Sequence, residues 1–117
     1  MTATYPITHD FCIRKVVPVF EAQVGTTAQV DITLIANGFP WPVPEGAEVQ
    51  IRSRRADGPI SIYRMNEWDG LCGIAGNVVS VTVPADATGE QGMISMQMVI
   101  EKDDHTIYAA HWRFNCR

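Results

Sequence analysis

The sequence predicts an all-β fold: an antiparallel β-sandwich of about seven to eight strands. Apolar and polar residues alternate in most segments, as they do in a strand with one buried face. Gly, Pro, Asn and Asp interrupt the chain at spacings of about ten residues, which is typical of the short strands of a sandwich. The 117 residues are too few for a second core, so we expect one domain, 1–117, with residues 1–10 as an N-terminal arm.

The first half of the chain contains two expected strands and a proline-rich connection. Residues 11–20 read as the first strand, in which Pro18 indicates an edge position or a bulge. Residues 30–36 alternate strictly and end at Asn37-Gly38, a turn signal because both residue types tolerate positive φ. Segment 39–46 carries three prolines, which exclude a helix or a central strand, so we expect a rigid connection that presents its aromatic side chains.

The second half reads as a succession of strands. We expect them at 47–55, 60–65, 71–74, 78–83, 92–101 and 106–116. The last two alternate most clearly and place Ile94, Met96, Trp112 and Phe114 on buried faces. Residues 102–105, Lys-Asp-Asp-His, close a hairpin between them.

Charge and hydropathy exclude two classes of partner. The formal net charge is −4, and the densest positive stretch, residues 52–55, is too small for the basic face that nucleic-acid binding requires. No apolar stretch approaches the roughly 20 residues of a membrane-spanning helix. The N-terminus lacks the charged start and apolar core of a signal peptide. We therefore expect synthesis in a cytoplasm and no nucleic-acid or membrane partner.

No residue pattern indicates catalysis, and we expect neither enzymatic activity, nor a bound metal, nor a cofactor. His9, His105 and His111 lack the close spacing of metal ligands and read as surface residues. No serine lies in a Gly-x-Ser-x-Gly motif.

The three cysteines, Cys12, Cys72 and Cys116, include no Cys-x-x-Cys pair. We interpret them as buried free thiols. A disulfide between Cys12 and Cys116 stays open as an alternative, because the first and last strands can be neighbours in a sandwich.

Four residues are candidates for binding another molecule: Trp41, Trp68, Arg52 and Arg54. Trp41 among prolines and Trp68 in a loop can anchor contacts, or can fold back to cap the core. The two arginines lie on the outward face of their strand and can pair with carboxylates of a partner. In the alternative hypothesis, the tryptophans with Glu67 and Asp69 form a platform for a carbohydrate.

The order of the segments resembles the N-terminal domain of phage upper baseplate proteins. In that family an alternating strand ends in a polar-Gly turn and a proline, as at 31–40, and a Gly-Ala-x-Val strand follows, as at 46–51, ending in an Asp-Gly turn. A Val-rich strand ends in a proline at 78–84, a glycine opens a long strand at 92–98, and the last strand ends Trp112-Arg113-Phe114.

This resemblance spans residues 27–116 and implies an immunoglobulin-like sandwich that works as a structural part of a virion: a baseplate, head-fibre or capsid-decoration component. It implies other virion proteins as partners and a homo-oligomeric assembly. The competing hypothesis is a carbohydrate-binding or host-adhesion module.

Overall fold

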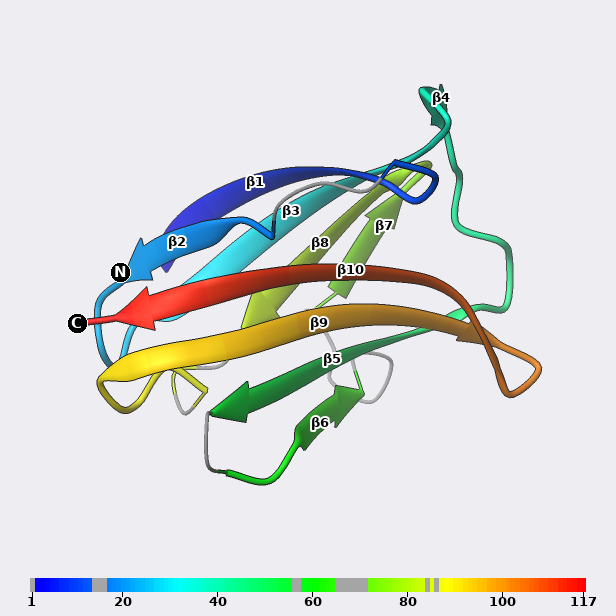
Figure 1. Ribbon diagram of the computed structural model, residues 1–117. Coiled ribbons are helices and arrows are strands. Elements are labelled where there is room, and N and C mark those ends of the chain that lie inside the picture. Colours follow the sequence, from blue (N-terminus) through cyan, green and yellow to red (C-terminus); the bar gives the residue numbers. More distant parts are fainter. Residues whose placement is uncertain (1, 14–16, 56–57, 65–71, 84, 86) are drawn as a thin grey trace.

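The computed structural model describes residues 2–13, 17–55, 58–64, 72–83, 85 and 87–117. Over this part of the chain, ten strands form two five-stranded sheets that pack face to face (Figure 1). The prediction of an all-β sandwich is confirmed, although the strands number ten instead of seven to eight. None of the described residues belongs to a helix that could cross a membrane.

The strand order is that of an immunoglobulin sandwich. The first sheet runs β1 (Thr2–Asp10), β3 (Thr27–Ala36), β8 (Val78–Val83) and β7 (Cys72–Ala75), with β4 (Phe39–Pro40) paired to the end of β3. The second sheet runs β2 (Val19–Ala22), β10 (His105–Cys116), β9 (Gly92–Lys102), β5 (Glu48–Arg55) and β6 (Ser61–Arg64). These orders match strands A-B-E-D of one immunoglobulin sheet and G-F-C of the other.

Two strand pairs are parallel, which corrects the expectation of a purely antiparallel sandwich. β1 runs parallel to β3, from Thr2 opposite Thr27 to Asp10 opposite Ile35. β2 runs parallel to β10. The chain reverses after β1 and joins the second sheet as β2 before it returns to the first sheet as β3.

The N-terminal segment differs from its prediction. Residues expected to form an arm are the nine-residue strand β1. Of the strand expected over 11–20, residues 11–13 form a turn, residues 14–16 lie outside the described residues, and β2 begins only at Val19. β1 is an edge strand in which Ile7 is the main buried apolar side chain. Its sequence therefore shows no strong alternation of apolar and polar residues. Pro6 is tolerated because an edge strand has one side without a hydrogen-bonded neighbour.

The buried faces follow the alternation of the sequence. Every second residue of β3, β9 and β10 points into the core, and Trp112, Tyr108 and Phe114 are its largest fully buried side chains. An aromatic side chain buries roughly 150–250 Å². Strand β10, which supplies all three, therefore provides much of the apolar area that holds the two sheets together.

Both chain termini lie at one end of the sandwich, and the turns next to β4 lie at the other (Figure 1). This second end, which we call the turn end, gathers the turn after β1, the β3–β4 turn and the β9–β10 turn. In immunoglobulin variable domains the connections equivalent to β3–β5 and β9–β10 form binding loops.

Candidate functional site

The carboxylate of Asp10 organises the turn end. Asp10 is the last residue of β1 and is buried. Its Oδ1 accepts hydrogen bonds from the backbone amides of Cys12 and Asn37, and its Oδ2 accepts one from the amide of Gly38, each at 2.9 Å. One side chain therefore fixes two turns that are far apart in sequence.

The Asn37-Gly38 turn has the backbone that the sequence predicts. Its φ angles are 52° at Asn37 and 82° at Gly38, the left-handed values of a two-residue hairpin turn. This turn reverses β3 into β4, where Phe39 pairs with Ala36. Phe39 therefore stands next to a turn whose two amides are held by Asp10.

The phenol of Tyr108 connects the two sheets beside Asp10. Its hydroxyl lies 2.7 Å from the carbonyl oxygen of His9 and 3.1 Å from that of Ile35, and either oxygen can accept its proton. The Nδ1 atom of His9 lies 3.0 Å from the same hydroxyl. Burial, as the main cause, raises the pKa of Tyr108 to about 12, so the hydroxyl stays protonated at neutral pH.

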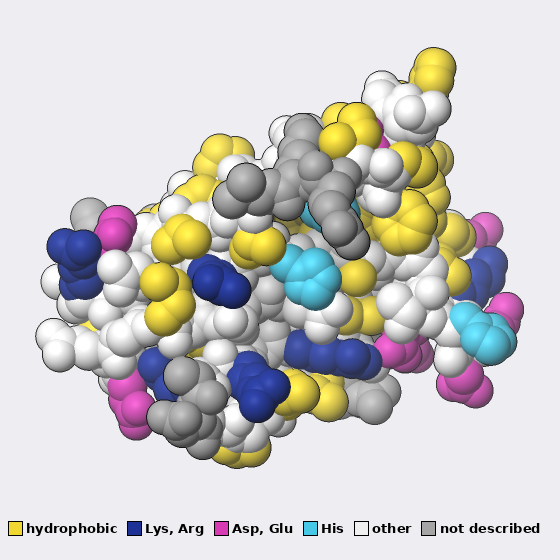
Figure 2. Space-filling model, in the orientation of Figure 1, with side chains coloured by type: hydrophobic (Ala, Val, Ile, Leu, Met, Phe, Trp, Pro, Cys, Tyr) yellow, Lys and Arg dark blue, Asp and Glu magenta, His cyan; other side chains and the backbone are white. Residues whose placement is uncertain are grey.

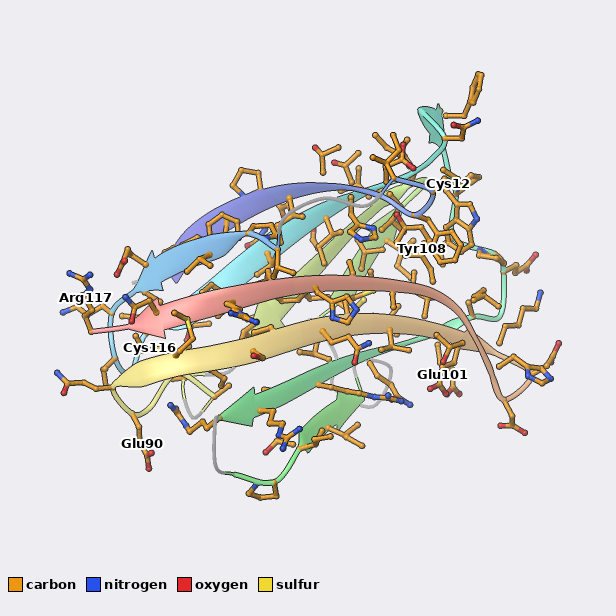
Figure 3. The ribbon with its side chains drawn as sticks, viewed as in Figure 1. Cys12, Glu90, Glu101, Tyr108, Cys116 and Arg117 are labelled. Atoms are coloured by element: carbon orange, nitrogen blue, oxygen red, sulfur yellow. The ribbon has the colours of Figure 1, made fainter. Side chains whose placement is uncertain are left out.

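Three rings surround that of Tyr108. The ring centroids of Trp41, Phe11 and His9 lie 4.9, 5.2 and 5.4 Å from the Tyr108 centroid. Figure 3 shows Tyr108 pointing from β10 toward the turn that carries Cys12. Trp41 is half-buried in this cluster, so it caps the end of the core, which was one of its two predicted roles.

Apolar side chains remain exposed at this end of the sandwich. Phe39 is 72% exposed and Phe11 is 57% exposed, and Ile13 lies in the same turn as Phe11. We call Phe11, Ile13 and Phe39 the aromatic end. Large apolar side chains held on a fixed backbone are typical of residues that anchor a protein contact, because little conformational entropy is lost on binding.

The other predicted site residues lie elsewhere. Trp68, with Glu67 and Asp69, lies outside the described residues. Arg52 and Arg54 point outward from β5, which lies between β9 and the edge strand β6 of the second sheet, away from the aromatic end. Trp41 and the two arginines therefore do not form one site.

The two arginines also differ from each other. The Nη2 atom of Arg52 donates to Glu101 Oε1 at 3.1 Å and to Gln50 Oε1 at 3.3 Å. Arg54 is exposed and makes no ion pair with any described residue. Arg54 is therefore the one of the two whose charge stays available to a partner.

Several predictions for single residues need correction. His9 is half-buried against Tyr108, whereas the sequence suggested a surface position. His105 and His111 are exposed, as predicted. Cys12 is exposed, so the three thiols are not all buried. Cys12 and Cys116 lie at opposite ends of the sandwich (Figure 3), which corrects the alternative of a disulfide between them.

Asp10, Tyr108 and Phe39 belong to the candidate site but were not predicted from the sequence. The sequence around Asp10 does not indicate its partners Asn37 and Gly38, because they lie in the distant turn between β3 and β4. Phe39 was signalled only by its place after Asn37-Gly38 and before the prolines. Within the described ranges, no group of His, Cys, Asp and Glu side chains gathers that could hold a metal ion.

Comparisons with known proteins identify the fold. No protein-family model and no curated protein sequence matches the chain. The N-terminal domain of phage TP901-1 ORF48 is similar in structure, with a TM-score of 0.71 and 10% identity over 100% of this chain and 99% of that one. The cysteine protease inhibitor EhICP2 from Entamoeba histolytica has a TM-score of 0.52 and 9% identity over 99% of this chain and 97% of that one.

Proposed function

We propose that this protein is a structural component of a phage virion, and that its aromatic end docks onto a neighbouring virion protein. The observation that carries the proposal is the end-to-end match of fold to a domain of phage TP901-1, at a TM-score of 0.71. The order of the sequence motifs, which resembles the N-terminal domain of phage upper baseplate proteins, independently supports the same role.

The fold by itself does not select this role, since a cysteine protease inhibitor shares it at a TM-score of 0.52. The resemblance of the sequence motifs and the higher structural similarity both favour the phage domain. A role in assembly or attachment is also consistent with the kind of surface present. Phe39 and Phe11 are exposed, Phe39 follows a turn whose Gly38 amide is bound by Asp10, and Phe11 packs against Tyr108.

A carbohydrate platform has less support from the described residues. A sugar stacks on an open aromatic face, but Trp41 is half-buried and packs against Tyr108. The aromatic end offers apolar rings with few polar partners, which suits a protein surface better than a sugar.

The proposal places the protein in the virion, next to other virion proteins and in several symmetric copies. Closed symmetry is the usual arrangement of such assemblies. Each copy would present the aromatic end to its neighbour. The carboxylate of Asp10 would hold the docking turn in its bound shape beforehand, so that less ordering is needed on contact.

The test is incorporation into particles. Virions are purified from a lysate of the host that carries the gene, and the protein is quantified by mass spectrometry for the wild type and for Phe39→Asp. We expect the wild type in a fixed copy number per particle and at least a tenfold loss for Phe39→Asp, because a charge at the centre of an apolar contact is strongly unfavourable.

Met93→Asp is the matched control. Met93 is also an exposed apolar residue, at the start of β9, and is opposite Asn115 at the other end of the sandwich. This change should leave incorporation within twofold of the wild type. Absence of the wild-type protein from the particles would refute the virion role, and an equal loss for both variants would refute the assignment of the aromatic end.

A further inference from the structure

The outer face of the second sheet carries a small hollow lined by two arginines, by polar residues and by two apolar residues. Its volume is about 200 Å³, below the roughly 300–1,000 Å³ of pockets that take drug-sized ligands. The hollow is therefore of a size for one side chain of a partner. It is lined by Arg52, Ser53, Arg54, Ile60, Ser95, Met96, Gln97 and His111.

Strand register explains why these side chains converge. Ser95 of β9 is opposite Arg54 of β5 on one side and Arg113 of β10 on the other. In the next row, Gln97 lies between Arg52 and His111. Neighbouring strands are about 4.8 Å apart, so long side chains on β5 and β10 stand on either side of the short Ser95 and leave a hollow between them.

Positive charge on this face is only partly compensated. Among the described residues, Glu101 pairs with Arg52 at 3.1 Å, and Glu21 pairs with Arg117 at 2.9 Å. Glu48, the first residue of β5, is opposite Glu101. Arg54 and Arg113 have no acidic partner in the described ranges, although the whole chain has a net charge of −4.

Figure 2 shows the same arrangement on the surface. Dark blue and cyan side chains gather on the middle of this face, and magenta side chains lie mostly toward its two ends. The chain is acidic overall, so this positive centre is a local feature set by the register of three strands.

We propose that this hollow binds a carboxylate side chain from an acidic, extended segment of a partner protein. Arg54 can bind the two carboxylate oxygens through a guanidinium fork, with Ser95, Gln97 and His111 as further donors. Ile60 and Ile62, both exposed beside the hollow on and next to β6, would contact the aliphatic neighbours of the carboxylate. These apolar contacts favour a peptide over a free anion.

This inference does not depend on the proposed virion role, because neither Phe11 nor Phe39 lines the hollow and the partner is defined by chemistry. It also changes the role predicted for the arginines. Arg52 is held by Glu101 and Gln50 and positions the wall of the hollow. Arg54 would contact the partner, and Arg113, across Ser95 on the other side of β9, would add to the positive field.

The test uses a defined probe: a fluorescein-labelled peptide of eight residues in which Glu alternates with Val. Binding to the wild-type protein is followed by fluorescence anisotropy in low salt. The same peptide with Gln for Glu should bind at least tenfold more weakly. Addition of salt should weaken binding of the Glu peptide, because the contact is between charges at the surface.

Arg54→Glu and Arg113→Glu should each weaken binding by about fivefold or more, since each replaces an attraction near the carboxylate by a repulsion. Arg117→Glu is the control: it changes the net charge equally, but Arg117 lies at the end of the chain in a pair with Glu21. It should alter binding less than twofold. Denaturant midpoints of all variants show whether each is folded.

Four results would overturn the proposal. The first is that the Glu peptide does not bind to the folded wild-type protein. The second is that the Gln peptide binds as tightly as the Glu peptide. The third is that Arg117→Glu weakens peptide binding as much as Arg54→Glu does. The fourth is self-association of the wild type in sedimentation that Arg54→Glu abolishes, which would assign the hollow to a second copy of this chain.

Discussion

The hydroxyl of Tyr108 lies 2.7 Å from the carbonyl oxygen of His9, so a side chain of the last strand is hydrogen-bonded to the backbone of the first strand, in the other sheet. The two residues are 99 positions apart in sequence. The same hydroxyl reaches Ile35 of β3 at 3.1 Å. This one group therefore ties β10 to the two strands that carry the turn end.

Removal of that hydroxyl should destabilise the protein. Tyr108→Phe keeps the ring contacts but removes a part-buried hydrogen bond to the carbonyl oxygen of His9, which costs about 1–2 kcal/mol. Tyr5→Phe is the control, because the Tyr5 hydroxyl donates to Glu21 in an exposed setting, where the loss should be about 0.5 kcal/mol or less. Urea denaturation measures both, and equal losses would contradict a special role for Tyr108.

Any side chain at position 38 should lower the stability of the folded protein. Its φ of +82° is strained for any L-residue, while nothing lies within 4 Å of an added Cβ. Gly38→Ala should therefore cost about 1 kcal/mol, through backbone conformation alone, and lower the melting temperature by roughly 4 °C.

Gly73→Ala provides the comparison for that change. Gly73 has equally open space and no positive φ, so alanine should be neutral or slightly stabilising, because it restricts the unfolded chain. If thermal melting shows the same loss for both substitutions, the explanation by backbone strain is wrong.

Stability should fall at alkaline pH because of Tyr108. Its pKa is raised to about 12, against about 10 in an unfolded chain. Below pH 10 both states hold the proton and the contribution is constant. Between about pH 10 and 12 the unfolded chain releases a proton that the folded chain retains, so unfolding becomes easier by on the order of 2 kcal/mol.

The measurement is urea denaturation from pH 9 to pH 12 for the wild type and for Tyr108→Phe. The wild type should lose stability more steeply over this range. Other groups, including thiols, ionise in both proteins, and the comparison removes their contribution. Parallel curves would show that Tyr108 ionises as readily in the folded protein as in the unfolded chain.

The three cysteines should react with iodoacetamide at different rates. Cys12 is exposed and should be alkylated first. Burial raises the pKa of the Cys72 and Cys116 thiols, and Cys116 is also inaccessible, so it should react last, because the thiolate is the nucleophile. Peptide mass spectrometry under native conditions, with a urea-unfolded sample as reference, measures the order. Peptides joined through Cys12 and Cys116 would contradict the structure.

The sequence by itself determined the local features of this protein. The two-residue alternation identified the inward faces of β3, β9 and β10, and Asn37-Gly38 and residues 102–105 identified two turns. Strand periodicity and turn chemistry depend on residues close in the chain, so one sequence is enough to recognise them. It also identified Arg54 as an outward cation.

Only the tertiary structure decided which residues distant in sequence contact one another. The parallel pairing of β1 with β3, the hold of Asp10 on Gly38, the cluster around Tyr108 and the hollow between Arg54 and His111 all join residues that are distant in sequence. An edge strand with one main buried apolar side chain shows little alternation of apolar and polar residues, and no local pattern predicts that a carboxylate binds the amides of a distant turn. Such contacts are set by strand register across the sandwich, and register is a property of the packed fold.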